Sequence, residues 1–139
     1  MTPEILSQLH TAGFAGTRGW SAEEFSDFLS DPACFVTGDE RAFALGRVVL
    51  DEAELLTITT HPDHRRQGHA RTTLLDWFAA ASEKGAAQAF LEVAADNIAA
   101  LDLYHSCGFQ TTGRRRRYYT RPDGMKSDAI TMMRVLAAA

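Results

Sequence analysis

One segment, residues 55–75, limits the possible fold more than any other part of the sequence. It reads LLTITTHPDHRRQGHARTTLL, so a β-branched strand passes through a proline turn into Arg65-x-x-Gly68-x-Ala70 and then directly into an apolar helix. Gly68 and the small Ala70 would let an anion approach backbone N–H groups that a first helical turn leaves unpaired. The pattern therefore predicts a phosphate cradle. An ordinary strand-to-helix connection has the same short pattern, so the rest of the chain must decide between them.

Cationic side chains surround this turn, at Arg65, Arg66 and Arg71. Guanidinium groups suit phosphate because each one donates several hydrogen bonds from a fixed planar fork. The same stretch also contains three histidines, His61, His64 and His69. We expect no metal site here, because the neighbouring arginine charges disfavour a bound cation.

Composition restricts the chain to one globular domain, residues 1–139, with 45% apolar and 23% charged residues. The net charge of −4 provides no general attraction to nucleic acid, although Arg114–Arg117 is a basic exception. No apolar run is long enough to cross a bilayer or to act as a signal segment. With Cys34 and Cys107 expected as free thiols, the sequence predicts a cytoplasmic protein without a membrane or direct nucleic-acid partner.

Hydrophobic spacing predicts an alternation of helices and strands. Helices are expected at 3–13, after the capping box of Ser21 and Glu24, at 68–84 and at 97–106. Strands are expected at 34–37, 42–50, 54–60, 88–93, 109–119 and 129–136, the last two joined by a turn at 122–124. The order predicts an α/β fold, in which a mixed, mostly antiparallel sheet carries helices on its faces. The cradle would then follow the carboxyl end of a strand, where open α/β sheets bind ligands.

Glu92 is a carboxylate inside an otherwise apolar strand, AFLEV at 89–93. Such a group must reach solvent, find a partner or take part in chemistry. Partial desolvation would raise its proton affinity and suit it to general-base catalysis, whereas a Glu at a sheet edge would simply point into water. Twelve residues later, Tyr104 lies on the predicted helix, where a core aromatic with a tethered hydroxyl is the alternative to a catalytic role. Asn97 suits a helix N-cap.

Taken together, these residues resemble the GNAT superfamily of acyl-coenzyme A-dependent N-acetyltransferases over most of the chain. The turn at 65–70 is similar to the pyrophosphate loop of that superfamily. A more specific similarity is to the bacterial ribosomal-protein alanine N-acetyltransferase (RimI-like) subgroup. It is carried by Trp20-Ser21, residues 49–53, Leu91-Glu92-Val93, Asp96-Asn97, Ala99-Ala100, Leu103-Tyr104, Cys107-Gly108-Phe109, and residues 114–119, 123–124 and 128–130.

The resemblance implies that Glu92 is the catalytic base and Tyr104 the acid. It also implies acetyl-coenzyme A as co-substrate, no metal, and a peptide or protein N-terminus as acceptor. A strand backbone would hold the pantetheine arm, and the arginine-rich turn would hold the pyrophosphate. The residues expected to bind coenzyme A are Ile58, Thr59, Thr60, Arg65, Arg66, Gln67, Gly68, His69, Ala70, Arg71 and Asn97.

Some positions depart from the family pattern. A strand precedes the first helix in the family, whereas Pro3 already starts a helix here, so the first strand is expected to be missing. That would expose a sheet edge, to be protected by a second copy or by residues from an upstream start codon. We accordingly expect a monomer or a weak homodimer. Ala70 stands where many relatives have Gly, and Gly19 replaces the proline that commonly precedes Trp20.

The leading hypothesis is direct acetyl transfer to a protein N-terminal amine, plausibly the N-terminal alanine of a small-subunit ribosomal protein. Binding both substrates together makes the transfer effectively unimolecular, so no acyl-enzyme is needed. Cys107 precedes a helix-ending glycine and is expected as a small buried hydrophobe rather than a nucleophile. The alternatives are acetylation of a small-molecule amine and a non-catalytic coenzyme A-binding regulatory module. For Arg114–Arg117, we expect alternation across a strand, either as a solvated edge or as a substrate-recognition face.

Overall fold

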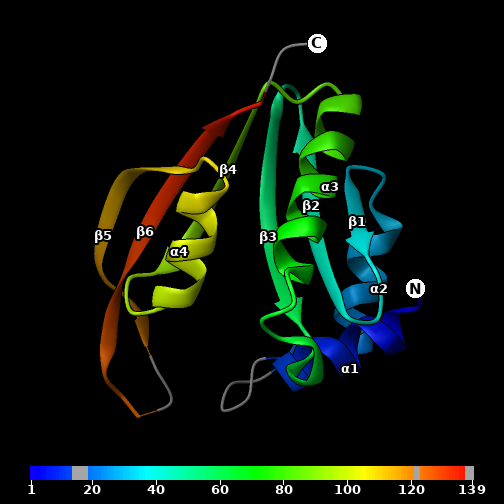
Figure 1. Ribbon diagram of the computed structural model, residues 1–139, viewed down its shortest axis with the longest axis horizontal. Helices are drawn as coiled ribbons and strands as arrows, with labels where there is room; N and C mark the ends of the chain where they lie inside the picture. The colour runs from blue at the N-terminus through cyan, green and yellow to red at the C-terminus, as the bar shows by residue number, and fades with distance from the viewer. Residues whose placement is uncertain (14–18, 121–122, 137–139) are drawn as a thin grey trace.

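Six strands form one mixed sheet in the order β1-β2-β3-β4-β6-β5 (Figure 1). The computed structural model describes residues 1–13, 19–120 and 123–136. The strands are β1 Cys34–Gly38, β2 Ala42–Val49, β3 Glu52–Thr60, β4 Gln88–Ala94, β5 Gln110–Thr120 and β6 Lys126–Val135. The helices are α1 Pro3–Gly13, α2 Ala22–Ser30, α3 His69–Glu83 and α4 Ile98–Ser106, with a short 3-10 turn, η1 Pro62–His64.

The capping residues predicted from the sequence lie at the ends of the helices. Ser21 accepts a hydrogen bond from the backbone of Glu24 and the Glu24 side chain accepts one from Ser21, so the capping box of α2 is complete. Asn97 caps α4 by accepting from Ala100 N–H. Helix α3 is followed by Gly85 in a left-handed conformation, φ 95°. The turn predicted at 122–124 lies partly outside the described residues.

Two separate cores form on the two faces of the sheet. On one face, α3 and α4 pack over the larger core, which includes Trp77, Phe78 and Phe109. On the other face, α1 and α2 enclose a smaller core of Leu6, Leu9, Phe25, Phe43 and Leu45. The prediction of helices on both faces is therefore confirmed. Among the described residues no strand precedes α1, and β1 and β5 form the two edges of the sheet.

Regular strand pairing is interrupted in the middle of the sheet. Strands β1, β2 and β3 form the expected antiparallel meander. Strand β3 then pairs in parallel with β4 at only three positions, ending with Glu54 opposite Phe90. Beyond that point the two strands diverge, each carrying its own half of the sheet and its own helix (Figure 1). The last strand, β6, lies between β4 and β5 and pairs antiparallel with both.

Candidate active site

The divergence of β3 from β4 leaves part of β3 with a strand on one side only. From Leu55 to Thr60, the described ladder joins β3 to β2 and not to β4. The β2–β3 register also shifts, since Leu45 lies opposite Thr57 but Gly46 lies opposite Leu55, so Leu56 is an extra residue in β3. A bulge of this kind redirects the backbone and side chains locally. The backbone of Ile58, Thr59 and Thr60 is thus available to a ligand lying between the strands.

The predicted cradle lies at the carboxyl end of this free stretch, where the chain turns into α3. Arg66 and Gly68 both have left-handed backbones, with φ of 62° and 81°. The first helical hydrogen bond of α3 runs from Thr72 N–H to the Gly68 carbonyl. The N–H groups of His69, Ala70 and Arg71 therefore have no backbone acceptor among the described residues, and no side chain caps Gly68. Such a helix N-terminus favours an anion.

Gly68 keeps this N-terminus open. A Cβ built at Gly68 meets no atom within 4 Å, so its side of the turn faces empty space rather than protein. The positive φ would also strain any L side chain at this position. The residues present therefore fit a pyrophosphate, which needs both the unpaired N–H groups and close backbone approach.

The three arginines near the turn have different partners. The Arg65 guanidinium donates to the Gly13 carbonyl at the end of α1, 3.0 Å away. Arg71 reaches across to the end of α4, where Nη1 lies 3.4 Å from the Ser106 carbonyl. Arg66 is exposed, and no hydrogen bond or ion pair joins it to another described residue. Arg66 is therefore best placed to bind a phosphate, while Arg65 and Arg71 also tie the turn to the flanking helices.

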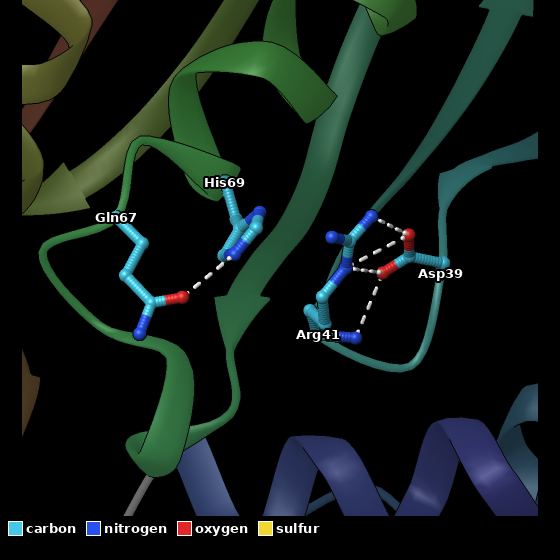
Figure 2. A network of polar contacts seen from close by, with 4 residues as sticks. All are labelled: Asp39, Arg41, Gln67 and His69. Atoms are coloured by element: carbon cyan, nitrogen blue, oxygen red, sulfur yellow. Dashed lines mark hydrogen bonds and ion pairs between the residues drawn. The ribbon is translucent and has the colours of Figure 1, made fainter.

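Polar contacts fix the other side chains around the turn. The imidazole of His69 lies 3.0 Å from the Gln67 side-chain oxygen, and Arg41 forms an ion pair with Asp39 (Figure 2). The hydrogen bonds that Arg41 donates hold the pKa of the Asp39 carboxyl well below its usual range. His61 N–H donates to the Arg41 carbonyl, which connects the β1–β2 turn to the cradle. No group of residues suited to a metal ion occurs in the described ranges.

Glu92 lies on β4 opposite Thr131 of β6, just past the point of divergence. Strand β4 lies between β3 and β6, but at Glu92 the described ladder joins β4 to β6 only, so Glu92 lies on the unpaired side of the split, as in the alternative of an edge-facing Glu that points into water. The Glu92 side chain keeps 30% of its accessible surface, so it is in contact with solvent and only partly removed from it. Its neighbours Leu91 and Val93 face the larger core, so the carboxylate points to the opposite face, the one covered in part by α1 and α2.

Tyr104 belongs to the larger core, on the other face of β4. It is 7% exposed and packs edge-on against Phe109, with ring centroids 5.8 Å apart. Burial raises the pKa of Tyr104 to about 12, so its phenol stays protonated at neutral pH. Glu92 and Tyr104 are not in contact in the part of the chain described. Glu92 and the core that contains Tyr104 lie on opposite faces of β4.

The arginine-rich strand does not alternate as predicted. Arg115 pairs with Ala129 and Tyr119 pairs with Ser127, so three residues of β5 lie opposite the single Asp128. This bulge, where Arg117 has a φ of 53°, breaks the alternation expected for Arg114–Arg117. Its cause is local, because Asp128 accepts hydrogen bonds from the Arg114 side chain and the Arg117 backbone.

A second charged group lies beside Glu92. The Arg115 guanidinium lies 3.7 Å from Glu92 Oε1 and 5.1 Å from the centre of the Tyr118 ring. Burial, followed by the nearby Glu92 carboxylate, raises the pKa of Tyr119. Glu92 is therefore surrounded by side chains of the β5–β6 hairpin, none of which the sequence pattern alone assigned to it.

Comparison with known proteins identifies the family. The model of the acetyltransferase (GNAT) family matches residues 5–109, most of the chain. The chain belongs to this family. The [ribosomal protein bS18]-alanine N-acetyltransferase of Escherichia coli strain K12 is 45% identical over 95 residues, which cover 68% of this chain and 64% of that relative. The chain thus spans just under two thirds of that relative's length.

A second relative and a solved structure match this chain over more of their own length. The N-alpha-acetyltransferase RimI of Mycobacterium tuberculosis is 35% identical over 137 residues, covering 92% of this chain and 83% of the relative. The crystal structure of the Escherichia coli ribosomal-protein-S18-alanine N-acetyltransferase has a TM-score of 0.87 and 34% identity, covering 99% of this chain and 89% of that one. The fold predicted from the resemblance is therefore confirmed as the GNAT fold.

His10 has a structural role within this GNAT fold that no sequence pattern predicts. It is 4% exposed on α1, its Nδ1 accepts a hydrogen bond from Trp20 N–H, and its Nε2 lies 3.2 Å from Thr57 Oγ1. Since Nδ1 is an acceptor, a neutral His10 carries its proton on Nε2 and donates to Thr57. His10 thereby joins both N-terminal helices to the bulge of β3. The contact spans 47 residues, and no local motif signals it.

The two cysteines are free thiols, Cys34 partly exposed and Cys107 buried. Burial raises the pKa of the Cys34 thiol, and the Asp31 carboxylate adds to the effect. Cys107 lies in the larger core beneath the end of α4, as expected for a small hydrophobe. No helix in the described ranges is long and apolar enough to span a membrane.

Proposed function

We propose that this protein transfers the acetyl group of acetyl-coenzyme A to the N-terminal amine of a polypeptide, with the N-terminal alanine of a ribosomal protein of the bS18 type as the acceptor. One observation carries the proposal. The gap between β3 and β4 opens beside the uncapped N-terminus of α3, with Glu92 on one face of the sheet and Tyr104 on the other. In this proposal the thioester is held at the gap, with Glu92 as the proton acceptor and Tyr104 as the proton donor.

The backbone supplies most of the cofactor contacts in this proposal. The N–H groups at the start of α3 and the Arg66 guanidinium bind the pyrophosphate. The unpaired side of β3 at Ile58–Thr60 binds the pantetheine arm, and an N–H there polarises the thioester carbonyl. The side-chain oxygen of Asn97 is used in capping α4, which leaves its amide N–H₂ for coenzyme A.

Glu92 and Tyr104 divide the proton transfers. A protein α-amine has a pKa near 8 and is mostly protonated at pH 7, so Glu92 accepts a proton from it, directly or through water. The free amine attacks the acetyl carbonyl carbon, a C–N bond forms, and the C–S bond breaks, while the proton that the nitrogen loses in becoming an amide passes through water to the departing thiolate. The departing sulfur takes a hydrogen bond from the Tyr104 hydroxyl.

Tyr104 acts mainly by donating that hydrogen bond. A thiol has a pKa of about 8.5, whereas that of Tyr104 is raised to about 12, so complete proton transfer to the thiolate would be uphill. A neutral phenol nevertheless stabilises the negative charge as it develops on sulfur. The free thiols and a ribosomal acceptor both fit a cytoplasmic setting for this reaction.

The test is acetylation by the purified protein, followed by mass spectrometry and by release of free coenzyme A. The acceptors are a peptide with the N-terminal sequence of the organism's own S18 protein, the same peptide with a blocked amine, and a panel of small amines including polyamines. We expect acetylation of the free peptide alone, at its α-amine. Preferential acetylation of a small amine would assign the protein to the alternative substrate class. Tight binding of acetyl-coenzyme A without thiol release from any acceptor would indicate a non-catalytic module.

A further inference from the structure

Alternation along β3 decides which of its backbone groups face the gap between β3 and β4. In an antiparallel pair, successive residues direct their N–H and C=O groups alternately towards the partner strand and away from it. His61 N–H donates to the Arg41 carbonyl at the end of the β2–β3 ladder. The groups of Thr59 and Thr57, at alternate positions before His61, therefore also point to β2. Those of Ile58 point the other way, into the gap.

Helix α1 holds the side chains of the two residues that flank Ile58. His10 Nε2 lies 3.2 Å from Thr57 Oγ1, and the two residues are only 4% and 9% exposed. About one turn further along α1, a Cβ built at Gly13 would clash with Thr59 Oγ1, so the helix backbone packs directly against that side chain. The last turns of α1 therefore lie along β3 on both sides of Ile58.

The bulge in β3 brings Thr57 under α1. Leu55 belongs to the larger core, whereas Leu56 packs against the smaller core beneath α1 and α2. Side chains of a regular strand alternate between faces, but the extra residue lets Leu56 and Thr57 both face α1. His10 thus contacts the first residue after the bulge, where the ladder with β2 resumes.

The His10 imidazole is itself held firmly. Trp20 stacks on it with ring centroids 4.7 Å apart, and Phe25 meets it edge-on at 5.6 Å. Trp20 N–H donates to His10 Nδ1, which fixes the direction of Nε2–H towards Thr57. Moving β3 along α1 would break this buried hydrogen bond, which is costly, whereas apolar contacts tolerate small displacements.

We propose that His10 is a positioning residue for acetyl transfer, acting through Thr57 to aim the backbone N–H of Ile58 at the thioester carbonyl. The inference rests on the proposed function, in which a backbone N–H of β3 polarises that carbonyl. Such a donor is effective only when it lies about 2.7–3.1 Å from the position where the oxyanion develops. Without the hydrogen bond from His10, β3 keeps its ladder with β2 but loses the contact that sets its position after the bulge.

Two substitutions at Thr57 separate the hydroxyl from the shape of the side chain. Thr57→Val removes the hydroxyl and nearly keeps the volume, whereas Thr57→Ser keeps the hydroxyl. With a peptide acceptor, we expect kcat to fall by about 10-fold in Thr57→Val and to stay within about twofold in Thr57→Ser. KM for acetyl-coenzyme A should change by no more than about threefold, because the cradle at α3 is untouched.

Thr37→Val is the matched control for lost stability. Thr37 Oγ1 donates to the Thr73 carbonyl at 3.1 Å, so this variant also removes a threonine hydroxyl that joins a strand to a helix. It does so on β1, at the edge of the sheet and away from the gap. Urea titration compares the stabilities, and kcat is measured at a temperature where all variants are folded. We expect wild-type kcat in Thr37→Val.

The bound thioester gives a readout that lost stability does not produce. Acetyl-coenzyme A isotopically labelled at the acetyl carbonyl carbon is bound without acceptor, and infrared difference spectroscopy measures the carbonyl stretching frequency. Polarisation by an N–H donor lowers this frequency relative to the free cofactor. We expect the wild type to lower it and Thr57→Val to lose about half of the shift or more.

Substitutions at His10 test which of its hydrogen bonds matters. Gln has an amide N–H₂ in place of Nε2, and Asn has a carbonyl oxygen in place of Nδ1. His10→Gln can therefore still donate to Thr57, whereas His10→Asn can still accept from Trp20. We expect kcat of the Gln variant to exceed that of the Asn variant by about threefold or more. The reverse order would mean that His10 acts through Trp20 and would overturn the proposal.

The remaining outcomes separate this inference from the proposed function. Wild-type kcat and carbonyl frequency in Thr57→Val, or an equal loss of kcat in Thr37→Val, would overturn the role of His10 while sparing the proposed function. A wild type that releases no coenzyme A with any acceptor would instead contradict the proposed function. The carbonyl measurement needs no acceptor, so a wild type that binds the cofactor without lowering its frequency would overturn the role of His10 in that case as well.

Discussion

The cofactor side and the acceptor side of the candidate site are built in different ways. The cofactor side, formed by β3, the turn and the start of α3, is one continuous segment whose unpaired backbone groups would bind the cofactor in the proposed function. The acceptor side gathers Glu92, Arg115 and Tyr119 from strands that are adjacent only after folding. A backbone site depends on conformation, whereas a side-chain site depends on which residues tertiary contacts bring together. Substitutions should therefore affect the two sides separately.

The largest expected effect is on the acceptor side. Glu92→Gln removes the proton acceptor without changing the size of the side chain, so kcat should fall by about 10²-fold or more. Acetyl-coenzyme A affinity, measured by calorimetry, should stay within a few-fold of the wild type. Wild-type turnover in this variant would remove Glu92 from the mechanism.

Tyr104→Phe tests the donor on the opposite face of β4. Loss of the hydroxyl should reduce kcat by about 10²-fold, again with cofactor affinity within a few-fold. Single-turnover measurements distinguish slow chemistry from slow product release. An unchanged single-turnover rate would mean that Tyr104 is only a core aromatic.

On the cofactor side, Gly68→Val should raise KM for acetyl-coenzyme A by about 10-fold with little change in acceptor KM. The Cβ would occupy the open side of the cradle, and the left-handed backbone would be strained. Gly85→Val is the matched control, since Gly85 is also left-handed and open but lies at the other end of α3. An equal rise in KM in both variants would indicate a general loss of stability.

A smaller effect should appear in stability at high pH. Tyr104 has a pKa of about 12 when folded and 10 in its ordinary state, so folding favours the protonated phenol. This stabilisation is complete below pH 10 and is lost as pH rises through 12. The wild type should therefore lose up to about 3 kcal/mol more unfolding free energy than Tyr104→Phe over that range, as measured by urea titration. Parallel curves for the two proteins would contradict burial of the phenol.

The smallest effect should come from a position remote from both sides. Ser21→Ala removes the N-cap of α2 and should cost about 1 kcal/mol of unfolding free energy. Both KM values should remain unchanged at a temperature where the variant is folded. A shift in acceptor KM alone would show that α2 also orders the acceptor side.

The difference between the two sides also explains which parts of the candidate site could be predicted from the sequence. The cradle was predictable because Gly68, the arginines and the following helix are local in sequence, and local geometry determines the backbone there. The capping box at Ser21 and Glu24 was predictable for the same reason. The environment of Glu92 was not, because Arg115 and Tyr119 come close to it from a strand that is distant in the sequence.

The sequence by itself determined the order and nearly the limits of the helices and strands, the cradle, and the family resemblance, since these depend on side-chain periodicity and short-range hydrogen bonds. Only the tertiary structure decided that β6 lies between β4 and β5, that β3 and β4 separate after three pairs, and that Leu56 bulges. Only tertiary contacts placed Arg115 against Glu92 and joined His10 to Thr57. Those features depend on pairing between distant segments, which is selected by packing of the whole sheet against its helices.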